Sequence, residues 1–248
     1  MSEFERAEEL VVGLYQRGID LVPENRIITI GVPKILNSGI WSPYLVNLRL
    51  ALSRDTASKL GLMRQAHLTD LMLGAYVDRL DRASRLAGGF DHIYGDPEAG
   101  TPLAAAIAAK GSFSNIWRRV DTGSKMDRGS HAELEGAVYS GQVVVQVDDV
   151  ATSGQTGVEG KNFLGKHGLS SEHLVVLGDR EQGAAEELEK SEITLHAAFG
   201  ATAMFGYLHE AGLLTRTEHE FLIDYTQGVP PTAEPLDHPW KKAAQALG

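Results

Sequence analysis

The stretch from residue 143 to residue 213 constrains the fold most, because apolar strand-like runs alternate there with helical segments. The runs Val143–Val147, Leu174–Leu177 and Ile193–Leu195 are short and are separated by polar or glycine-containing segments. Helices are expected between and after them, at Val158–His167, Ala184–Glu189 and Phe205–Leu213. Strands that alternate with helices predict an α/β fold with a central, mostly parallel sheet flanked by helices.

The N-terminal half continues this pattern less clearly. The expected elements are a helix through residues 4–15, strands at 27–30 and 44–48, a helix from Thr69 or Asp70 to about Leu86, a strand at 90–94, a helix at 103–110 and a strand at 114–120. Residues 121–141 are polar and show no clear period, and residues after Gln227 are rich in proline and small side chains, which predicts an extended tail. A length of 248 residues fits one domain with a decoration.

Composition narrows the classes of function. The chain has no cysteine, which excludes a disulfide framework, an iron–sulfur cluster, a thiolate zinc site and a cysteine nucleophile. A net charge of −10 disfavours general binding to nucleic acid, although a local basic patch could serve a small phosphorylated ligand. The apolar runs are shorter than the ~20 residues of a membrane helix. The acidic N-terminus lacks the pattern of a signal peptide, so we expect a cytoplasmic protein without membrane contact.

The run Val143–Val147 is followed by an acid pair, Asp148 and Asp149, and then by small residues that lead into a helix. Ligands of open α/β sheets bind at the carboxyl ends of the strands. The N–H groups and dipole of a helix N-terminus attract phosphate, and the acid pair suits sugar hydroxyls or a water-bound magnesium ion. The pattern therefore indicates a ribose-phosphate site. An equally open alternative is that the acids only cap the helix and solvate a turn, since the segment has neither a P-loop nor a three-glycine dinucleotide motif.

The acid-pair segment resembles the phosphoribosyl-pyrophosphate (PRPP) motif of type I phosphoribosyltransferases. Three further segments resemble the orotate phosphoribosyltransferases within that class. They are Ser38-Gly-Ile-Trp-Ser-Pro-Tyr44, Gly95-Asp-Pro-Glu-Ala-Gly100-Thr-Pro102 and Leu174-Val-Val-Leu-Gly-Asp179-Arg180 with the Gly183-Ala that follows. The four segments stand in the family's order and spacing, and they cover roughly residues 25–215.

The resemblance implies transfer of phosphoribosyl from PRPP to orotate, which gives orotidine 5′-monophosphate and pyrophosphate. It implies a type I phosphoribosyltransferase domain at 1–226, with an N-terminal hood at about 1–60, a core at about 61–226 and a tail at 227–248. The PRPP-binding residues it implies are Arg119, Asp148, Asp149, Ala151, Thr152, Ser153, Gly154, Gln155 and Thr156. The base-binding residues it implies are Ser38, Tyr44, Thr152 and Arg180, with Arg180 pairing with the orotate carboxylate.

The same resemblance implies a long flexible lid loop at residues 118–136, which reaches into the neighbouring subunit of a homodimer. Lys125, Arg128 and His131 of this loop, together with Asp149, are the implied catalytic residues. The implied cofactor is Mg²⁺, bound through PRPP and water rather than directly by protein ligands. An ordinary solvated loop is the alternative at 118–136, a surface salt bridge the alternative for Arg180, and simple packing the alternative for Tyr44.

Several positions depart from the family pattern. Asn37, Ile40 and Ala99 stand where the family often carries basic residues, Gln155 stands where glycine is common, and the basic residues of the lid do not align one to one. Two further functions therefore stay open. The chain could transfer phosphoribosyl to another base, or it could be a regulatory protein that binds PRPP without efficient catalysis.

Overall fold

The computed structural model describes residues 3–16, 28–35, 41–46, 62–97, 99–119 and 133–228. The chain folds into two compact units. The first consists of residues 1–72, 178–182 and 199–248, and the second of residues 73–177 and 183–198. The division into hood, core and tail drawn from the sequence stays a prediction, and the two units are described separately below.

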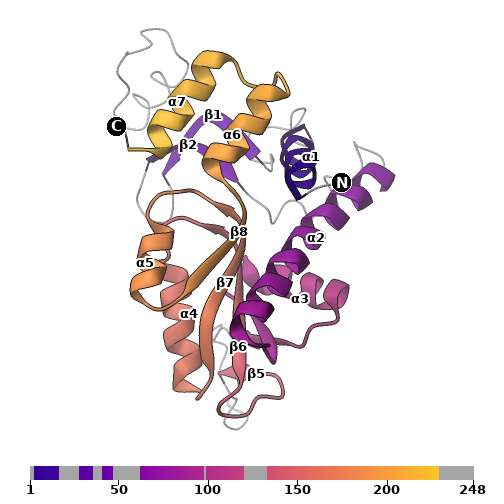
Figure 1. Ribbon diagram of the computed structural model, residues 1–248, viewed down its shortest axis with the longest axis vertical. Coiled ribbons are helices and arrows are strands. Elements are labelled where there is room, and N and C mark those ends of the chain that lie inside the picture. The colour runs from indigo at the N-terminus through magenta and orange to yellow at the C-terminus, as the bar shows by residue number, and fades with distance from the viewer. Residues whose placement is uncertain are drawn as a thin grey trace, which may run out of the picture. The chain divides into compact units, whose positions relative to one another are not determined.

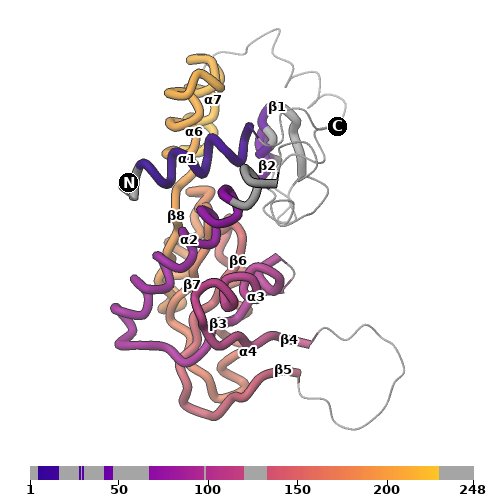
Figure 2. Tube along the Cα trace, turned by 90° about the vertical axis from the view of Figure 1, so that its right-hand side faces the viewer, coloured from indigo at the N-terminus to yellow at the C-terminus, as the bar shows by residue number. Residues whose placement is uncertain are grey.

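The second unit contains a six-stranded sheet in the order β5-β4-β3-β6-β7-β8 (Figure 1). The strands are β3 (His92–Gly95), β4 (Asn115–Arg118), β5 (Leu134–Glu135), β6 (Val143–Ala151), β7 (Ser170–Asp179) and β8 (Thr194–Gly200), the last two continuing into the first unit. Strand β3 pairs in parallel with both β4 and β6, whereas β4 and β5 are antiparallel and run alongside each other in Figure 2. The predicted α/β fold with a mostly parallel sheet is confirmed.

Helices cover both faces of this sheet. Figure 1 shows α4 (Gln155–Lys166) and α5 (Ala184–Lys190) on one side of the strands, and α2 (Leu62–Ala87) and α3 (Gly100–Gly111) on the other. Alternate strand residues face α4, and there Tyr94, Ile116 and Val144 form a core with Phe163 and Leu164 of the helix. Burial of these apolar side chains is the main force that holds the layers together. None of the described helices is long and apolar enough to cross a membrane.

The order of the strands creates a switch point between β3 and β6. After β3 the chain moves outward to β4 and β5, and then returns to the opposite side of β3 to form β6, β7 and β8. The register pairs Gly95 with Val147, so the segments that follow β3 and β6 leave the sheet next to each other. Such a switch point is the usual ligand site of an open α/β sheet.

Close packing of backbone against backbone holds the segment that follows β3 beside the end of β6. Asp96 N donates to Val147 O at 2.9 Å and extends the β3–β6 ladder by one residue. Gly100, the first residue of α3, lies so near β6 that a Cβ atom there would collide with Val147 O. A Cβ atom at Gly95 would likewise collide with the carbonyl group of Gly100. Both glycines are therefore required by contact with backbone, which cannot move aside as a flexible side chain can.

The first unit contains an antiparallel pair, β1 (Ile28–Ile35) and β2 (Trp41–Val46), and three helices, α1 (Glu3–Gln16), α6 (Ala201–Glu210) and α7 (Arg216–Thr226). Tyr44 of β2 lies in its core, with its ring edge-on to Phe205 at a centroid distance of 5.0 Å and to Tyr225 at 6.2 Å. Helix α7 begins with a capping box, in which the Thr215 side chain and the Glu218 carboxylate each bond to the other's backbone N–H.

Several element boundaries differ from those expected, and the boundaries of β6 and α4 bear on the site. Strand β6 runs to Ala151 and includes the acid pair, which the sequence analysis placed in a loop, and α4 begins at Gln155 rather than at Val158. The connection needs only three residues because Gly154 adopts a left-handed conformation with φ of 78°. Helix α2 begins at Leu62, and α7 was not predicted although its Thr-x-x-Glu capping motif is present in the sequence.

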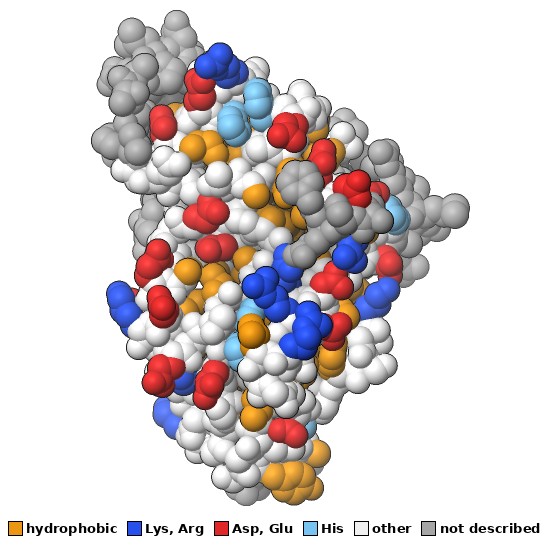
Figure 3. Space-filling model, viewed as in Figure 1, with side chains coloured by type: hydrophobic (Ala, Val, Ile, Leu, Met, Phe, Trp, Pro, Cys, Tyr) orange, Lys and Arg blue, Asp and Glu red, His pale blue; other side chains and the backbone are white. Residues whose placement is uncertain are grey.

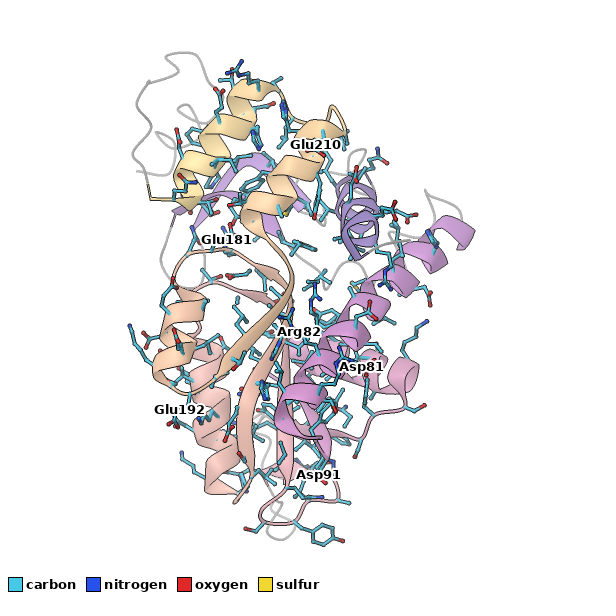
Figure 4. The ribbon with its side chains drawn as sticks, in the orientation of Figure 1. Asp81, Arg82, Asp91, Glu181, Glu192 and Glu210 are labelled. Carbon is cyan, nitrogen blue, oxygen red and sulfur yellow. The ribbon has the colours of Figure 1, made fainter. Side chains whose placement is uncertain are left out.

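A pair of buried histidines joins β7 to β8. His173 and His196 are 8% and 5% exposed, and His173 Nδ1 lies 3.0 Å from His196 Nε2. One ring must donate and the other accept, so the pair is stable with both rings neutral. Burial lowers the pKa of His196 to about 4, with further lowering by His173 and by Arg82 and Arg79 of α2. Figure 4 shows Arg82 on α2 beside the strands, and Figure 3 shows histidine side chains next to a group of basic ones in this region.

We expect this pair to make the fold sensitive to acid. A histidine whose folded-state pKa lies below its unfolded value contributes stability that is lost as the pH falls from about 6.5 towards 4. His196 alone should lower the free energy of unfolding by about 2 kcal/mol between pH 7 and pH 5. Urea unfolding at the two pH values measures this loss. The double variant His173→Leu/His196→Leu should lose most of the difference, and an unchanged difference would contradict the assignment.

The close approach of α3 to β6 gives a second prediction. Gly100→Ala should destabilise the fold by about 2 kcal/mol or more, because the new methyl group meets the backbone of β6. Gly74→Ala is the matched control in the same unit, since a Cβ atom at Gly74 in the middle of α2 meets nothing within 4 Å. That change should stabilise the protein by about 0.5–1 kcal/mol. Equal effects of the two substitutions in thermal unfolding would refute the packing argument.

Candidate active site

The acid pair lies at the carboxyl end of β6 in half-buried positions. Asp148 Oδ1 accepts the backbone N–H of Asp149 at 2.9 Å, and Asp149 Oδ1 accepts that of Val150 at 2.7 Å. The strand end is anchored by Tyr76 of α2, whose buried hydroxyl donates to Asp148 O at 2.9 Å. Burial, with added effects of Asp149 and Asp148, raises the pKa of Tyr76, so this hydroxyl stays a donor. The two carboxylates are thus acceptors held at a strand end, as the hydroxyls of a sugar require.

The turn after the acid pair presents the N-terminus of α4. Ala151 is buried, Thr152 is half-buried, and Ser153 and Thr156 are exposed. Among the described residues no side chain accepts a hydrogen bond from the first N–H groups of this helix, so the alternative that the acid pair serves as its cap is wrong. The first N–H groups of α4 therefore have no intrahelical acceptor, and they form the positive end of the helix dipole. Such an end binds phosphate.

Contact with α5 fixes the shape of this turn. A Cβ atom at Gly154 would lie 2.9 Å from Ala184 O, and the left-handed conformation of Gly154 would be strained in any other residue. The side chain of Gln155 lies along the helix, where Nε2 donates to Glu159 Oε1 at 3.1 Å. Gln155 therefore offers its backbone N–H rather than its side chain to a ligand at the helix end.

The switch point brings a second loop to the same edge of the sheet. Residues 95–97 and 99–100 follow β3 beside β6, and Thr101 Oγ1 donates to Gly95 O at 3.3 Å. Arg119 directly follows β4, where its guanidinium lies 3.4 Å from a Glu135 carboxylate oxygen. Both side chains of this ion pair are about half exposed, so its contribution to stability is small and the arginine can exchange partners.

The catalytic residues expected in the lid, Lys125, Arg128 and His131, lie outside the described residues, as does Ser38. Their roles stay predictions. Of the remaining implied site residues, the structure brings Asp148, Asp149 and residues 151–156 together in the second unit. Arg119 belongs to the same unit, whereas Tyr44 and Arg180 belong to the first.

Arg180 is buried in the first unit, with 3% of its surface exposed, so the alternative of a surface salt bridge is wrong. Its Nη2 donates to Ser42 Oγ at 2.5 Å and to Tyr44 O at 3.5 Å, and its Nε donates to Gln182 Oε1 at 3.1 Å. The guanidinium carbon lies 4.0 Å from the centre of the Tyr44 ring, in cation–π contact. Among the described residues, none accepts a hydrogen bond from Nη1, so this nitrogen retains the capacity to bind an anion.

Tyr44 supports Arg180 rather than standing apart from it. The tyrosine is almost fully buried, and burial raises its pKa above the usual value although Arg180 acts in the opposite direction. Glu181, the next residue after Arg180, accepts Thr202 N and holds the first turn of α6 (Figure 4). The segment that carries Arg180 is therefore fixed by Glu181 directly after the arginine.

Sequence analysis missed two buried polar residues beside the acid pair. Asp96 and Gln146 are both fully buried in the second unit. Burial raises the pKa of Asp96 well above its ordinary value, and the negative charges of Asp148 and Glu159 raise it further. The signal in the sequence was a glutamine within the apolar run Val143–Val147, which should have indicated a buried polar contact.

Comparison with known proteins places these features in a family. No model of a known protein family matches the chain. It is 30% identical over 128 residues to an orotate phosphoribosyltransferase of Halobacterium salinarum, which covers 52% of this chain and 67% of that protein. It is also 30% identical over 164 residues to the uridine 5′-monophosphate synthase of Bos taurus, which covers 66% of this chain but only 30% of that longer protein.

The fold has a counterpart among solved structures. The structure of Leishmania donovani UMP synthase aligns with 90% of this chain and 42% of its own, with a TM-score of 0.67 and 24% sequence identity. The expected type I phosphoribosyltransferase fold is confirmed by this likeness together with the strand order described above. The matching segments and their sequence identity lead to one conclusion: the chain belongs to the orotate phosphoribosyltransferase family.

Proposed function

We propose that this protein transfers the phosphoribosyl group of PRPP to orotate, giving orotidine 5′-monophosphate and pyrophosphate in pyrimidine biosynthesis. The observation that carries the proposal is the uncapped N-terminus of α4, which directly follows the acid pair at the switch point between β3 and β6. The named activities of the related proteins support it, since those proteins are an orotate phosphoribosyltransferase and a uridine 5′-monophosphate synthase.

In this proposal, the residues at the edge between β3 and β6 have distinct roles in the reaction. The N–H groups at residues 154–156 and the hydroxyls of Thr152, Ser153 and Thr156 hold the 5-phosphate. Asp148 and Asp149 accept the ribose hydroxyls and stabilise positive charge that develops on the sugar when the bond to pyrophosphate breaks. The loop after β3 and Arg119 lie at the same edge and receive the departing pyrophosphate.

The carboxylates of the acid pair are hard oxygen donors of the kind that Mg²⁺ prefers, so the site fits a magnesium ion held through pyrophosphate and water. When bound, the ion supplies positive charge that lowers the cost of releasing pyrophosphate. The protein itself contributes orientation of two substrates and fixed dipoles, which suffices for a reaction without a protein nucleophile.

Arg180 is proposed to bind the orotate carboxylate through Nη1. Its other bonds, to Ser42, Tyr44 and Gln182, hold the guanidinium in one orientation, and such preorganisation strengthens a charge-assisted hydrogen bond. The other base-binding residues that the family resemblance implies are Ser38, Tyr44 and Thr152, and their roles stay proposals. The proposed lid residues close over pyrophosphate from the partner subunit of a homodimer; they are Lys125, Arg128 and His131. A cytoplasmic location is a separate proposal.

One observation favours a second candidate function. Ala99 is buried, and it stands in the loop after β3 where the family often carries a basic residue. A site with fewer cations on the pyrophosphate side would stabilise the leaving group less. The alternative is a protein that binds PRPP without efficient turnover, or one that uses a different base.

The activity is tested by mixing the purified protein with Mg²⁺, PRPP and orotate, and following the loss of orotate by ultraviolet absorbance. We expect orotate to be consumed only when PRPP is present. Asp149→Asn should lower kcat/KM by about 10²-fold, because it removes charge that stabilises the transition state.

Arg180→Lys should raise KM for orotate by about tenfold or more, because lysine keeps the charge but loses the planar geometry of guanidinium.

Ser42→Ala is the graded companion of Arg180→Lys, because it removes one bond that orients the guanidinium but keeps the guanidinium itself, so it should raise KM for orotate less than Arg180→Lys does. Thermal unfolding of each variant separates a lost contact from a lost fold. PRPP binding in calorimetry without orotate loss would overturn the orotate assignment, and a panel of other bases would then distinguish another transferase from a PRPP-binding regulatory protein.

A further inference from the structure

Asp96 is a fully buried carboxyl group whose hydrogen bonds are unaccounted for. It follows β3 directly, and its side chain is 0% exposed. Neither carboxyl oxygen has a hydrogen-bond partner among the described residues. A buried ionised carboxylate without partners costs several kcal/mol, so this arrangement requires a physical explanation.

Gln146 of β6, on the same face of the sheet, also has a buried oxygen without a hydrogen-bond partner in the described part of the chain. It too is 0% exposed, and its Nε2 donates to Ser171 Oγ of β7 at 3.1 Å. Its Oε1 has no partner among the described residues. The loop after β3 and the middle of β6 thus each bury one unsatisfied oxygen-bearing group.

Gly160 of α4 shows that these two groups face the same point. A Cβ atom at Gly160 would collide with both Gln146 Oε1 and Asp96 Oδ1, and the two oxygens therefore lie close to each other beside this glycine. Two acceptor oxygens that face each other require a hydrogen atom between them. The absence of a side chain at Gly160 leaves room for that contact.

The surroundings favour a proton on Asp96. The charged groups that act on it are Asp148 of β6 and Glu159 of α4, both negative, and they add to the effect of burial in raising its pKa. Tyr94 is the titratable neighbour on its own strand, and burial and Asp96 both raise the pKa of that hydroxyl. Rotation of the Gln146 amide would offer one N–H to a carboxylate, but one neutral donor does not offset a full charge buried beside two others.

We propose that Asp96 is a positioning residue for the pyrophosphate side of the site: as a neutral acid it donates a hydrogen bond to Gln146 Oε1 and so ties the loop after β3 to the strand that carries the acid pair. The role rests on the proposed function, because it supposes that the edge between β3 and β6 binds PRPP. The neutral form also keeps negative charge away from the place where pyrophosphate leaves.

The proton is tested first, without any ligand. Infrared spectroscopy of the whole protein at pH 7 should show the C=O stretch of a buried carboxylic acid, and Asp96→Asn should remove it. The same variant should be more stable than the wild type, by a margin that grows as the pH rises above 3.8, the ordinary pKa of the group. The wild type is the less stable protein at those pH values because Asp96, ionised in the unfolded chain, must take up a proton when the chain folds. Absence of the acid band, or its persistence in Asp96→Asn, overturns the proposal.

Positioning is tested by the affinity for Mg²⁺-PRPP in calorimetry. Asp96→Leu keeps the branched arrangement of heavy atoms but loses the donor, and it should weaken binding by about tenfold, the usual effect of one lost buried hydrogen bond. Asp96→Asn keeps a donor and should restore binding to within about threefold of the wild type. Gln146→Leu should act like Asp96→Leu, and the double variant should be no weaker than either single one, because both remove the same contact.

The outcomes separate this inference from the proposed function. If the wild type binds PRPP and Asp96→Leu binds it equally well while remaining folded in a thermal melt, the positioning role is wrong and the proposed function stands. Additive effects in the double variant would likewise contradict a shared contact. If the wild type binds no PRPP, the proposed function fails together with this role.

Discussion

The pairing of β3 with β6 is the constraint on which the candidate site depends. These strands are adjacent in the sheet but separated in the chain by β4 and β5. Their register places Gly95 opposite Val147, and close contact of Gly100 with Val147 O continues the pairing into α3. The loop after β3 and the acid pair therefore reach the same edge of the sheet. A shift of register would separate them and would also turn the apolar residues of β6 away from α4.

In the second unit several buried polar groups stay neutral, whereas the acid pair at the end of β6 is half-buried. Tyr76 holds the backbone of Asp148 through a hydroxyl that remains protonated, and the His173–His196 pair joins neighbouring strands without charge. At the end of β6 the two carboxylates of the acid pair stand in half-buried positions, next to the positive end of α4. The arrangement suits the phosphate and the sugar hydroxyls of the proposed substrate, although the chain as a whole is acidic. In the first unit, the buried charge of Arg180 is stabilised by a hydrogen bond to Ser42 and by the Tyr44 ring.

The sequence predicted those parts of the site that lie within one continuous motif. Asp148, Asp149 and residues 151–156 were identified because a strand, an acid pair and a helix start follow one another, although the structure extends β6 through the acid pair and starts α4 earlier. Helix α7 could have been predicted from its capping motif. The contact of Arg180 with Ser42, 138 residues away, and the approach of Asp96 to Gln146 depend on tertiary packing and register, which local patterns do not encode.

PRPP is proposed to bind at the edge between β3 and β6, with its 5-phosphate on the N-terminus of α4. The most direct measurement is a titration of isotopically labelled protein with Mg²⁺-PRPP, followed through the backbone amide signals in nuclear magnetic resonance. The largest shifts should fall on Ser153 to Thr156 and on residues 95–100, and ribose 5-phosphate alone should shift only the first group. Shifts confined to other parts of the chain, or none at saturating PRPP, would contradict the account.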